Sequence, residues 1–214
     1  MNAALKVHDL IGPLRPGAVR SDALVQQAGV DSCMAWMPYV VVRRIEAEGN
    51  RIAVGVRGRQ REERYAGWLD CEEVKRAHSP ESLRMRPHSV NLPAMHALDE
   101  LRVRWKWLPL PWGPAGSVAF ALATGAAAVR MESDLDIVVR AEQRLPQPWL
   151  QRMLRESSGL GCRVDVMIET PHGGVALWEF ASSATRLMLR TATGPRLVDD
   201  PWSAPAARIV EALV

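Results

Sequence analysis

Two aspartates alternate with apolar residues at the start of a long apolar stretch, Asp134-Leu135-Asp136-Ile137-Val138-Val139. The β-branched run is typical of a core strand, and alternate side chains of a strand share a face. Asp134 and Asp136 are therefore expected to point the same way, roughly 6–7 Å apart along the chain, while Leu135 faces the core. Carboxylates that converge in this way repel each other unless a cation lies between them. Because carboxylate oxygens are hard ligands, the segment predicts a core strand with a Mg²⁺ or Mn²⁺ site at its start.

A third acid, Asp165, interrupts a second apolar run, Val164-Asp165-Val166-Met167-Ile168. A charge inside a core strand is costly unless it has a partner. If this strand lies beside the first, Asp134, Asp136 and Asp165 meet at one point, as the carboxylates of a two-metal phosphoryl-transfer site do. These three residues are the candidate metal ligands and catalytic residues.

The dipeptide Gly116-Ser117 stands just before a helical segment, residues 118–125. Glycine lets the backbone approach a ligand closely, serine can cap a helix, and the N–H groups of a helix N-terminus bind phosphate oxygens. Each motif also has an ordinary structural reading, in which Asp134 caps a turn and the Gly-Ser pair merely begins a helix. The ordered set, completed by Asp165 about thirty residues after the first pair of acids, favours a functional site.

The chain is expected to divide into a β-rich part, residues 1–88, and a second part, residues 89–214, with alternating helices and strands. The elements expected in the first part are a hairpin within residues 34–58 with its turn at Glu48-Gly49-Asn50, a strand near residues 63–69, a short helix over residues 70–78 and an irregular linker near residues 79–92. Those expected in the second part are a helix over residues 92–107, an extended approach to Gly116, helices over residues 117–124 and 147–157, and strands over residues 134–140 and 162–168.

Composition limits the classes of function. The 27 basic and 24 acidic residues leave a net charge of +3, which by itself does not indicate a nucleic-acid partner. No apolar run approaches the roughly 18 residues of a membrane span, and the N-terminus lacks a signal-peptide pattern, so we expect a cytoplasmic chain without a membrane partner. Cys33, Cys71 and Cys162 form no CxxC pair and are expected to be free thiols.

The order Gly-Ser, helix, Asp-x-Asp strand and third acid resembles the nucleotidyltransferase superfamily. Several longer strings look more narrowly like the phosphoribosyl-dephospho-CoA transferases, the holo-acyl-carrier-protein synthases of malonate decarboxylase. These strings are HDL at residues 8–10, GVRGRQR at 55–61, PWGPAGSVAFALATG at 111–125, ESDLDIVVR at 132–140 and RVDVMIETPHGG at 163–174. The resemblance implies an α+β fold, in which a small β-rich domain is followed by a nucleotidyltransferase-like α/β domain with a mixed sheet.

The resemblance also implies an activity. Members transfer phosphoribosyl-dephospho-CoA from 2'-(5''-triphosphoribosyl)-3'-dephospho-CoA to a serine of the apo acyl carrier protein, and diphosphate leaves. Carried to this chain, Asp134 and Asp136 would hold the metal that bridges the triphosphate, while Gly116 and Ser117 would hold its diphosphate end. Asp165 would ligate a second metal or polarise the acceptor hydroxyl. The alternatives are another metal-dependent nucleotidyltransferase, acting on a small molecule or a protein, and a non-catalytic nucleotide-binding module.

Basic and aromatic residues supply weaker candidates. One group of arginines has two possible roles: it either binds donor phosphates or an acidic carrier-protein surface, or it forms a solvated strand face. The group consists of Arg57, Arg59, Arg61 and Arg64. Arg130 and Arg140 flank the acidic strand and either balance the triphosphate or form structural ion pairs. Trp105, Trp107 and Trp112 either stack on the adenine of the donor or fill the core. His172 is a candidate to approach the site, whereas His8, His78, His88 and His96 lack metal-ligand spacing and are expected in surface or capping roles.

Overall fold

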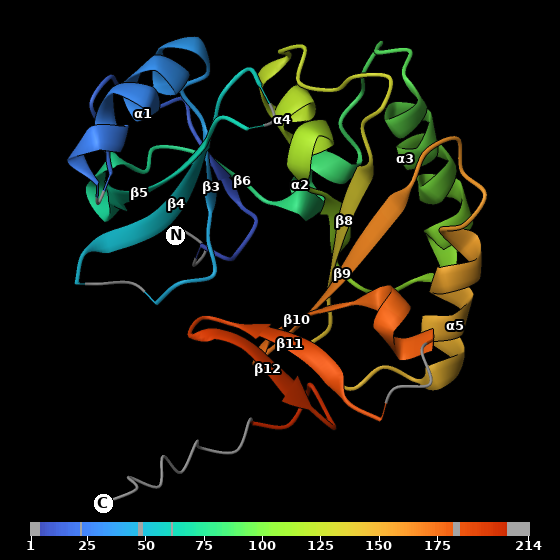
Figure 1. The fold of residues 1–214 in the computed structure, drawn as a ribbon. Helices are drawn as coiled ribbons and strands as arrows, with labels where there is room; N and C mark the ends of the chain where they lie inside the picture. The colour runs from blue at the N-terminus through green and yellow to red at the C-terminus, as the bar shows by residue number, and fades with distance from the viewer. Residues whose placement is uncertain (1–4, 22, 47–48, 61, 182–184, 205–214) are drawn as a thin grey trace, which may run out of the picture.

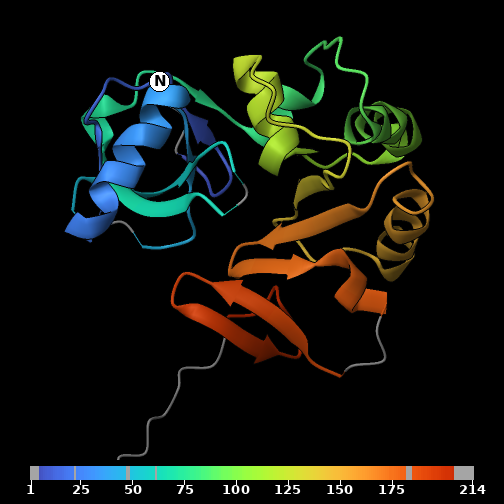
Figure 2. The ribbon, with the colours of Figure 1, turned by 45° about the horizontal axis from the view of Figure 1, so that its top comes forward.

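The computed structural model describes residues 5–21, 23–46, 49–60, 62–181 and 185–204, and these residues form two six-stranded sheets (Figure 1). The N-terminal sheet and the C-terminal sheet lie side by side, and each has helix packed on the face turned away from the other (Figure 2). The expected α+β class is confirmed. No helix within the described residues has the length and apolar character needed to cross a bilayer.

All strand pairs of the N-terminal sheet are antiparallel. In spatial order the strands are β2 (Val19–Arg20), β5 (Arg64–Asp70), β4 (Arg51–Arg57), β3 (Val40–Val42), β1 (Leu10–Ile11) and β6 (Ala77–His78). Helix α1 (Leu24–Trp36) packs on one face, where Val30 meets Val40, Val54 and other buried residues. The other face of β3, β4 and β5 is turned towards the C-terminal sheet (Figure 1).

The C-terminal sheet is mixed, as expected, because β8 and β9 are parallel and every other pair is antiparallel. In spatial order its strands are β12 (Gly194–Val198), β11 (Leu187–Thr191), β10 (Gly173–Ala176), β9 (Val164–Thr170), β8 (Leu135–Arg140) and β7 (Trp112–Pro114). Parallel neighbours need a crossover connection. Helix α5 (Gln147–Glu156) lies in the connection between β8 and β9.

The remaining helical elements surround this second sheet. They are α2 (Pro80–Arg84), α3 (Pro93–Arg104), α4 (Gly116–Thr124) and the short 3-10 turns η2 (Trp105–Trp107) and η3 (Leu177–Ala181). A further 3-10 turn, η1 (Cys71–Glu73), follows β5 in the N-terminal half. Figures 1 and 2 show α3 and α5 on the face of β8 and β9 that is turned away from the N-terminal sheet. The core lies there, because the alternating residues Leu135 and Ile137 of β8 are fully buried in one cluster with Leu98 of α3 and Met153 of α5.

Two buried charge clusters join the halves. Arg140, at the end of β8, donates to Asp9 at 3.1 Å and to Glu81 at 2.5 Å. Glu169, near the end of β9, accepts from Arg44 and lies 2.9 Å from the Nε2 atom of His8. Because each cluster combines residues from both sheets or their flanking segments, the face of β8 and β9 opposite the core is held against the N-terminal sheet.

Most expected elements of the first part are present, and the corrections concern residues 34–36, residues 70–78 and the linker expected near residues 79–92. The hairpin of β3 and β4 and the third strand β5 are confirmed, but residues 34–36 end α1 instead of beginning a strand. The expected helix over residues 70–78 is wrong, because only η1 is helical and Ala77–His78 pair with β1. Glu48, in the expected turn, lies outside the described residues.

The segment expected to be an irregular linker contains the ordered helix α2. Ser79 caps this helix, since its Oγ atom accepts from the N–H of Ser82 at 3.2 Å, and Pro80 occupies the first turn, where proline is tolerated. Leu83 is buried in the larger core and anchors the helix beside β7 and α4. In the second part, α3, α4, α5, β8 and β9 confirm the expected helices and strands to within two or three residues.

Candidate active site

Asp136 and Asp165 are direct register partners on the parallel strands β8 and β9. Both side chains are half-buried on the sheet face opposite the core, and Asp134 precedes β8 on the same side. Burial raises the pKa of Asp136, and the carboxylates of Asp165 and Asp134 raise it further, against the opposite influence of Arg64 and Arg57. The charged form of Asp136 is therefore disfavoured until positive charge approaches it.

Gly116 brings the beginning of α4 directly against this carboxylate. The N–H of Ala115 donates to the carbonyl oxygen of Asp136 at 2.8 Å, and Gly116 has a φ of 54°. A Cβ atom at this position would overlap the Oδ2 atom of Asp136. Glycine is thus required for both the left-handed backbone and the close approach. The N–H groups in the first turn of α4 have no hydrogen-bond partner within the helix, and this turn starts beside the acidic pair Asp136 and Asp165.

Ser117 does not cap α4, contrary to expectation. The capping position is Ala115, without a side-chain hydrogen bond to the helix. Ser117 lies in the first turn, is 8% exposed and lines the same cavity as the acids. It can therefore offer its hydroxyl, together with first-turn N–H groups, to an anion at the helix start.

The acids lie in a cavity of about 950 Å³ between the two sheets. This cavity brings together most of the predicted metal- and substrate-binding residues, namely Arg57, Arg59, Arg64, Gly116, Ser117, Arg130, Asp134, Asp136 and Asp165. Arg61, the remaining member of the arginine group, lies outside the described residues. Residues from two different sheets thus form one site, with the three carboxylates on the C-terminal side, Arg57, Arg59 and Arg64 on the N-terminal side, and Arg130 in the segment between α4 and β8.

The arginines of the N-terminal sheet are held in position by aromatic rings. Arg57 lies over the ring of Phe120, with its Cζ atom 5.9 Å from the centroid, and Arg59 lies 5.7 Å from the ring centroid of Trp36. Arg130 donates to the carbonyl oxygen of Arg59 at 2.7 Å and so bridges the two halves. Four cavity arginines have no carboxylate partner within 4.0 Å among the described residues; these are Arg43, Arg59, Arg64 and Arg130. Such a wall suits a polyanion.

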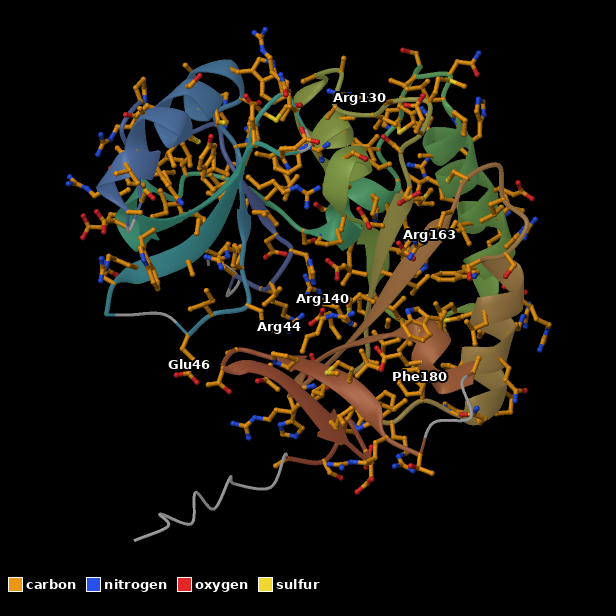
Figure 3. All side chains as sticks on the ribbon, viewed as in Figure 1. Arg44, Glu46, Arg130, Arg140, Arg163 and Phe180 are labelled. Carbon is orange, nitrogen blue, oxygen red and sulfur yellow. The ribbon has the colours of Figure 1, made fainter. Side chains whose placement is uncertain are left out.

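The donor set fits a hard divalent cation. Three carboxylates can supply oxygen ligands, and burial with the neighbouring carboxylates raises the pKa of Asp136, an effect that a bound cation would oppose. Within the described ranges, no three His, Cys, Asp or Glu side chains are already gathered into a ligand set. One reason is that Arg163 holds the side chain of Asp165, at 2.9 Å from Nη2 and 3.0 Å from Nε. Figure 3 shows Arg163 at the end of β9 where the acids lie.

Other nominated side chains have structural roles. Trp105 and Trp112 are buried in the core, with ring centroids 5.0 Å apart, so the alternative that they stack on adenine is wrong. Trp107 packs against Trp149 and donates to Glu156 at 2.7 Å. Arg140 forms buried ion pairs with Asp9 and Glu81 and does not line the cavity. His172 does not line the cavity either.

The sequence did not indicate several residues that line the cavity. His8 was expected at the surface or in a cap, but it lines the cavity and lies beside Glu169, at the joint where the two sheets meet. Arg43 directly follows β3 and lines the cavity on the same side as Val41, a position that strand alternation continued past β3 would have indicated. Arg190 and Trp178 come from β11 and η3, and no motif marks them.

Comparison with known proteins agrees with this geometry. Residues 82–201 match the family model described as the phosphoribosyl-dephospho-CoA transferase MdcG C-terminal domain, and residues 6–80 match the MdcG N-terminal domain. The chain belongs to the phosphoribosyl-dephospho-CoA transferase family. Both halves of the transferase, including the two walls of the cavity, fall within the matched ranges.

Curated relatives of the transferase cover almost the whole chain. Proteins named phosphoribosyl-dephospho-CoA transferase are 39% identical over 196 residues in Pseudomonas fluorescens strain Pf-5 and 37% identical over 197 residues in Pseudomonas aeruginosa PAO1. These alignments cover 92% and 91% of this chain, and 93% and 92% of the relatives. A relative of the same name in Azotobacter vinelandii is 36% identical over 211 residues, 94% of this chain and 95% of its own. No solved structure matches the transferase.

Proposed function

We propose that this chain transfers phosphoribosyl-dephospho-CoA from 2'-(5''-triphosphoribosyl)-3'-dephospho-CoA to a serine of the apo acyl carrier protein of malonate decarboxylase. The observation that carries this proposal is the pairing of Asp136 with Asp165 beside Gly116, opposite an arginine-lined wall of the same cavity. Carboxylates that can hold a metal and guanidinium groups that can hold phosphates are the parts that phosphoryl transfer requires.

The reaction is an in-line displacement at the α-phosphorus of the triphosphate. A bond forms between the serine Oγ atom of the carrier protein and the α-phosphorus, and the bond from that phosphorus to the bridging oxygen of the β-phosphate breaks. The serine hydroxyl loses its proton, and diphosphate leaves with the bond electrons. No covalent intermediate with the enzyme is needed, since positioning and charge stabilisation can drive such a step.

Each wall of the cavity has a part in this chemistry. Arg57 and Arg64 stabilise the charge that develops on the diphosphate, and the first turn of α4, with Gly116 and Ser117, holds its oxygens. Asp165 lies at the edge of the acidic pair, where it can accept the serine proton once Arg163 releases it. Arg59 and Arg130, which are joined by a hydrogen bond, add positive charge to the same cavity and meet the remaining phosphate charge.

We further propose Mg²⁺ or Mn²⁺ as the cofactor, with Asp134 and Asp136 as ligands and Asp165 as a third ligand or as the base. The cation would neutralise triphosphate oxygens and orient the α-phosphate for attack. The support for this proposal is the chemistry of the donor set and the raised pKa of Asp136. We also expect this reaction to take place in the cytoplasm, without nucleic acid or membrane.

The test is a reconstituted transfer reaction. The purified chain, the apo carrier protein, the triphosphoribosyl donor and Mg²⁺ are incubated together, and the carrier protein is analysed by intact mass spectrometry while released diphosphate is measured. We expect one prosthetic group for each diphosphate, and no modification of a carrier protein whose acceptor serine is replaced by alanine. Diphosphate release with an unmodified carrier would favour a nucleotidyltransferase with another acceptor. Donor binding without diphosphate release would favour a binding module.

A further inference from the structure

The cavity walls are arranged in three parallel rows across the strands. The acidic row places Asp136 and Asp165 on the C-terminal sheet, opposite Arg57 and Arg64, which are register partners on the N-terminal sheet. Both pairs line the same cavity, and the guanidinium groups of Arg64 and Arg57 lower the pKa of Asp136 against the effect of burial. This row is the site of the proposed chemistry.

Two residues further along every strand, both walls become apolar. On the C-terminal sheet, Met167 pairs with Val138 and Ala176, and all three line the cavity. On the N-terminal sheet, Gly55 pairs with Val41 and Ala66, and these also line it. At about 3.3 Å per residue, this apolar row lies roughly 7 Å from the acidic row. Gly55, Ala66 and Ala176 have no side chain or a single methyl group, so this row contributes little side-chain volume to the cavity.

Another two residues along, the cavity becomes basic again. Arg43 directly follows β3 and lies beside Ala53 of β4, to whose carbonyl oxygen its N–H donates at 2.9 Å. Arg190 of β11 pairs with Gly174, which in turn pairs with Glu169. The ion pair between Arg44 and Glu169 brings these two ends together across the cavity, and Figure 3 shows Arg44 beside the strands β10 and β11. This distal row is about 13 Å from the acidic row.

The distal row has unbalanced positive charge. The carboxylate of Glu169 pairs with Arg44 and His8, and it therefore does not neutralise Arg43 and Arg190, which line the cavity. Arg43 has no acidic partner within 4.0 Å in the described part of the chain. Arg190 has a loose pair with Glu179 at 3.9 Å, and its Nη1 atom lies 3.6 Å from the Sδ atom of Met167. Trp178, which is 60% exposed, lines the same cavity from η3. Two basic ends separated by an apolar row match a ligand with two anionic groups on either side of an apolar one.

We infer that Arg43 and Arg190 bind the diphosphate of the dephospho-CoA half of the donor, while the triphosphate lies at the acidic row. The inference rests on the proposed function for the identity of the ligand, which carries a triphosphoribosyl group at the 2' oxygen of its adenosine and a pantetheine-bearing diphosphate at the 5' oxygen. The apolar row then receives the adenosine between these groups. The two arginines become specificity residues that select a donor with a second polyphosphate over a simple nucleoside triphosphate.

The direct test measures binding of 3'-dephospho-CoA, which has the diphosphate but no triphosphate, by calorimetry without divalent cation. We expect Arg43→Gln and Arg190→Gln each to weaken binding about tenfold or more, as for the loss of a charge-assisted hydrogen bond. Arg20→Gln and Arg155→Gln, which remove exposed arginines outside the cavity, serve as controls and should bind normally. Asp136→Asn should also retain binding, because the acidic row is not used by this ligand.

A kinetic test uses the same variants with the complete donor. Arg43→Gln and Arg190→Gln are expected to raise KM for the donor about tenfold and to leave kcat within a few-fold of its original value. A donor analogue that lacks the 5'-diphosphate should show the same KM with these variants as with the unchanged chain. Thermal unfolding is measured for each variant to check that it is folded.

The outcomes separate this inference from the proposed function. Unchanged affinity for dephospho-CoA in both variants, no binding to the unchanged chain, or loss of binding in Arg64→Gln alone would overturn the inference, even if transfer proceeds. Arginine-dependent binding without modification of the carrier protein would support the distal site and reject the proposed acceptor.

Discussion

Asp136 of β8 and Asp165 of β9 occupy the same register position in a parallel strand pair. Neighbouring strands are about 4.8 Å apart, so two carboxylates that belong to the sheet itself are held close by backbone hydrogen bonds. The close approach of Gly116 to Asp136 adds a helix N-terminus to the same point. This arrangement is costly in the absence of positive charge, and its consequences for activity and stability can be measured.

Asp136→Asn is expected to lower kcat/KM for transfer by at least about 100-fold, because each factor of ten corresponds to about 1.4 kcal/mol and a metal ligand contributes several. The fold should be retained or slightly stabilised, since burial and two neighbouring carboxylates disfavour the charge that the substitution removes. Mass spectrometry of the carrier protein and thermal unfolding measure the two effects. Asp199→Asn, at an 88% exposed side chain, is the control. A variant at position 136 with more than half of the original activity would contradict the metal-site proposal.

The stabilising effect of Mg²⁺ is expected to grow with pH. The pKa of Asp136 is raised above its ordinary value of 3.8, so the stability associated with this group is present below that value and is lost as pH rises through the folded-state pKa. A cation favours the charged form and opposes this loss. Differential scanning fluorimetry should therefore show a larger Mg²⁺-induced rise in Tm at pH 8 than at pH 5, and a smaller difference in Asp136→Asn. Equal shifts at both pH values in both proteins would argue against a cation at this carboxylate.

Gly116→Ala and Gly125→Ala form a matched pair at the two ends of α4. Both glycines have positive φ, so each substitution costs about 1 kcal/mol of backbone strain. Only at Gly116 would the added methyl group overlap Asp136, whereas nothing lies within 4 Å at Gly125. We expect Gly116→Ala to lose about 100-fold or more in kcat/KM and Gly125→Ala to retain activity with a slightly lower Tm. Similar activity in the two folded variants would show that the close approach is unimportant.

Glu169→Gln is expected to destabilise the joint between the two sheets by about 2–3 kcal/mol at neutral pH, because charge-assisted hydrogen bonds are lost. Burial raises the pKa of Glu169, but hydrogen bonds from His8 and Arg44 outweigh it and lower the pKa to about 2. The stability that this group provides is present above its ordinary pKa of 4.5 and is lost as pH falls towards 2.

Denaturant unfolding should therefore show a large difference between Glu169→Gln and the unchanged chain at pH 7, and a smaller one at pH 3. Glu142→Gln, at a 75% exposed side chain, controls for loss of one negative charge. A difference that is the same at both pH values would show that ionisation of Glu169 does not stabilise the joint.

Local patterns in the sequence were sufficient for the centre of the C-terminal sheet. Strand alternation correctly assigned Leu135 to the core and Asp136 to the opposite face, because a period of two is a property of the backbone. The prediction of an irregular linker near residues 79–92 was wrong. A proline interrupts the interior of a helix but is tolerated in its first turn, so the sequence around Pro80 allows either a break or a helix start. Burial of Leu83 against β7 and α4 favours the helix start.

The sequence by itself determined which residue types could perform the chemistry and on which strands they lie, because side-chain type and strand alternation are local properties. It could not determine that Arg43 and Arg190 share a cavity with Asp136, since Arg43 directly follows β3 of the N-terminal sheet, whereas Arg190 and Asp136 lie on β11 and β8 of the C-terminal sheet. Only the packing of the two sheets, held together by the ion pairs of Arg140 and Glu169, places these three residues around one cavity. Contacts between distant segments depend on the free energy of the whole folded chain, which no short motif encodes.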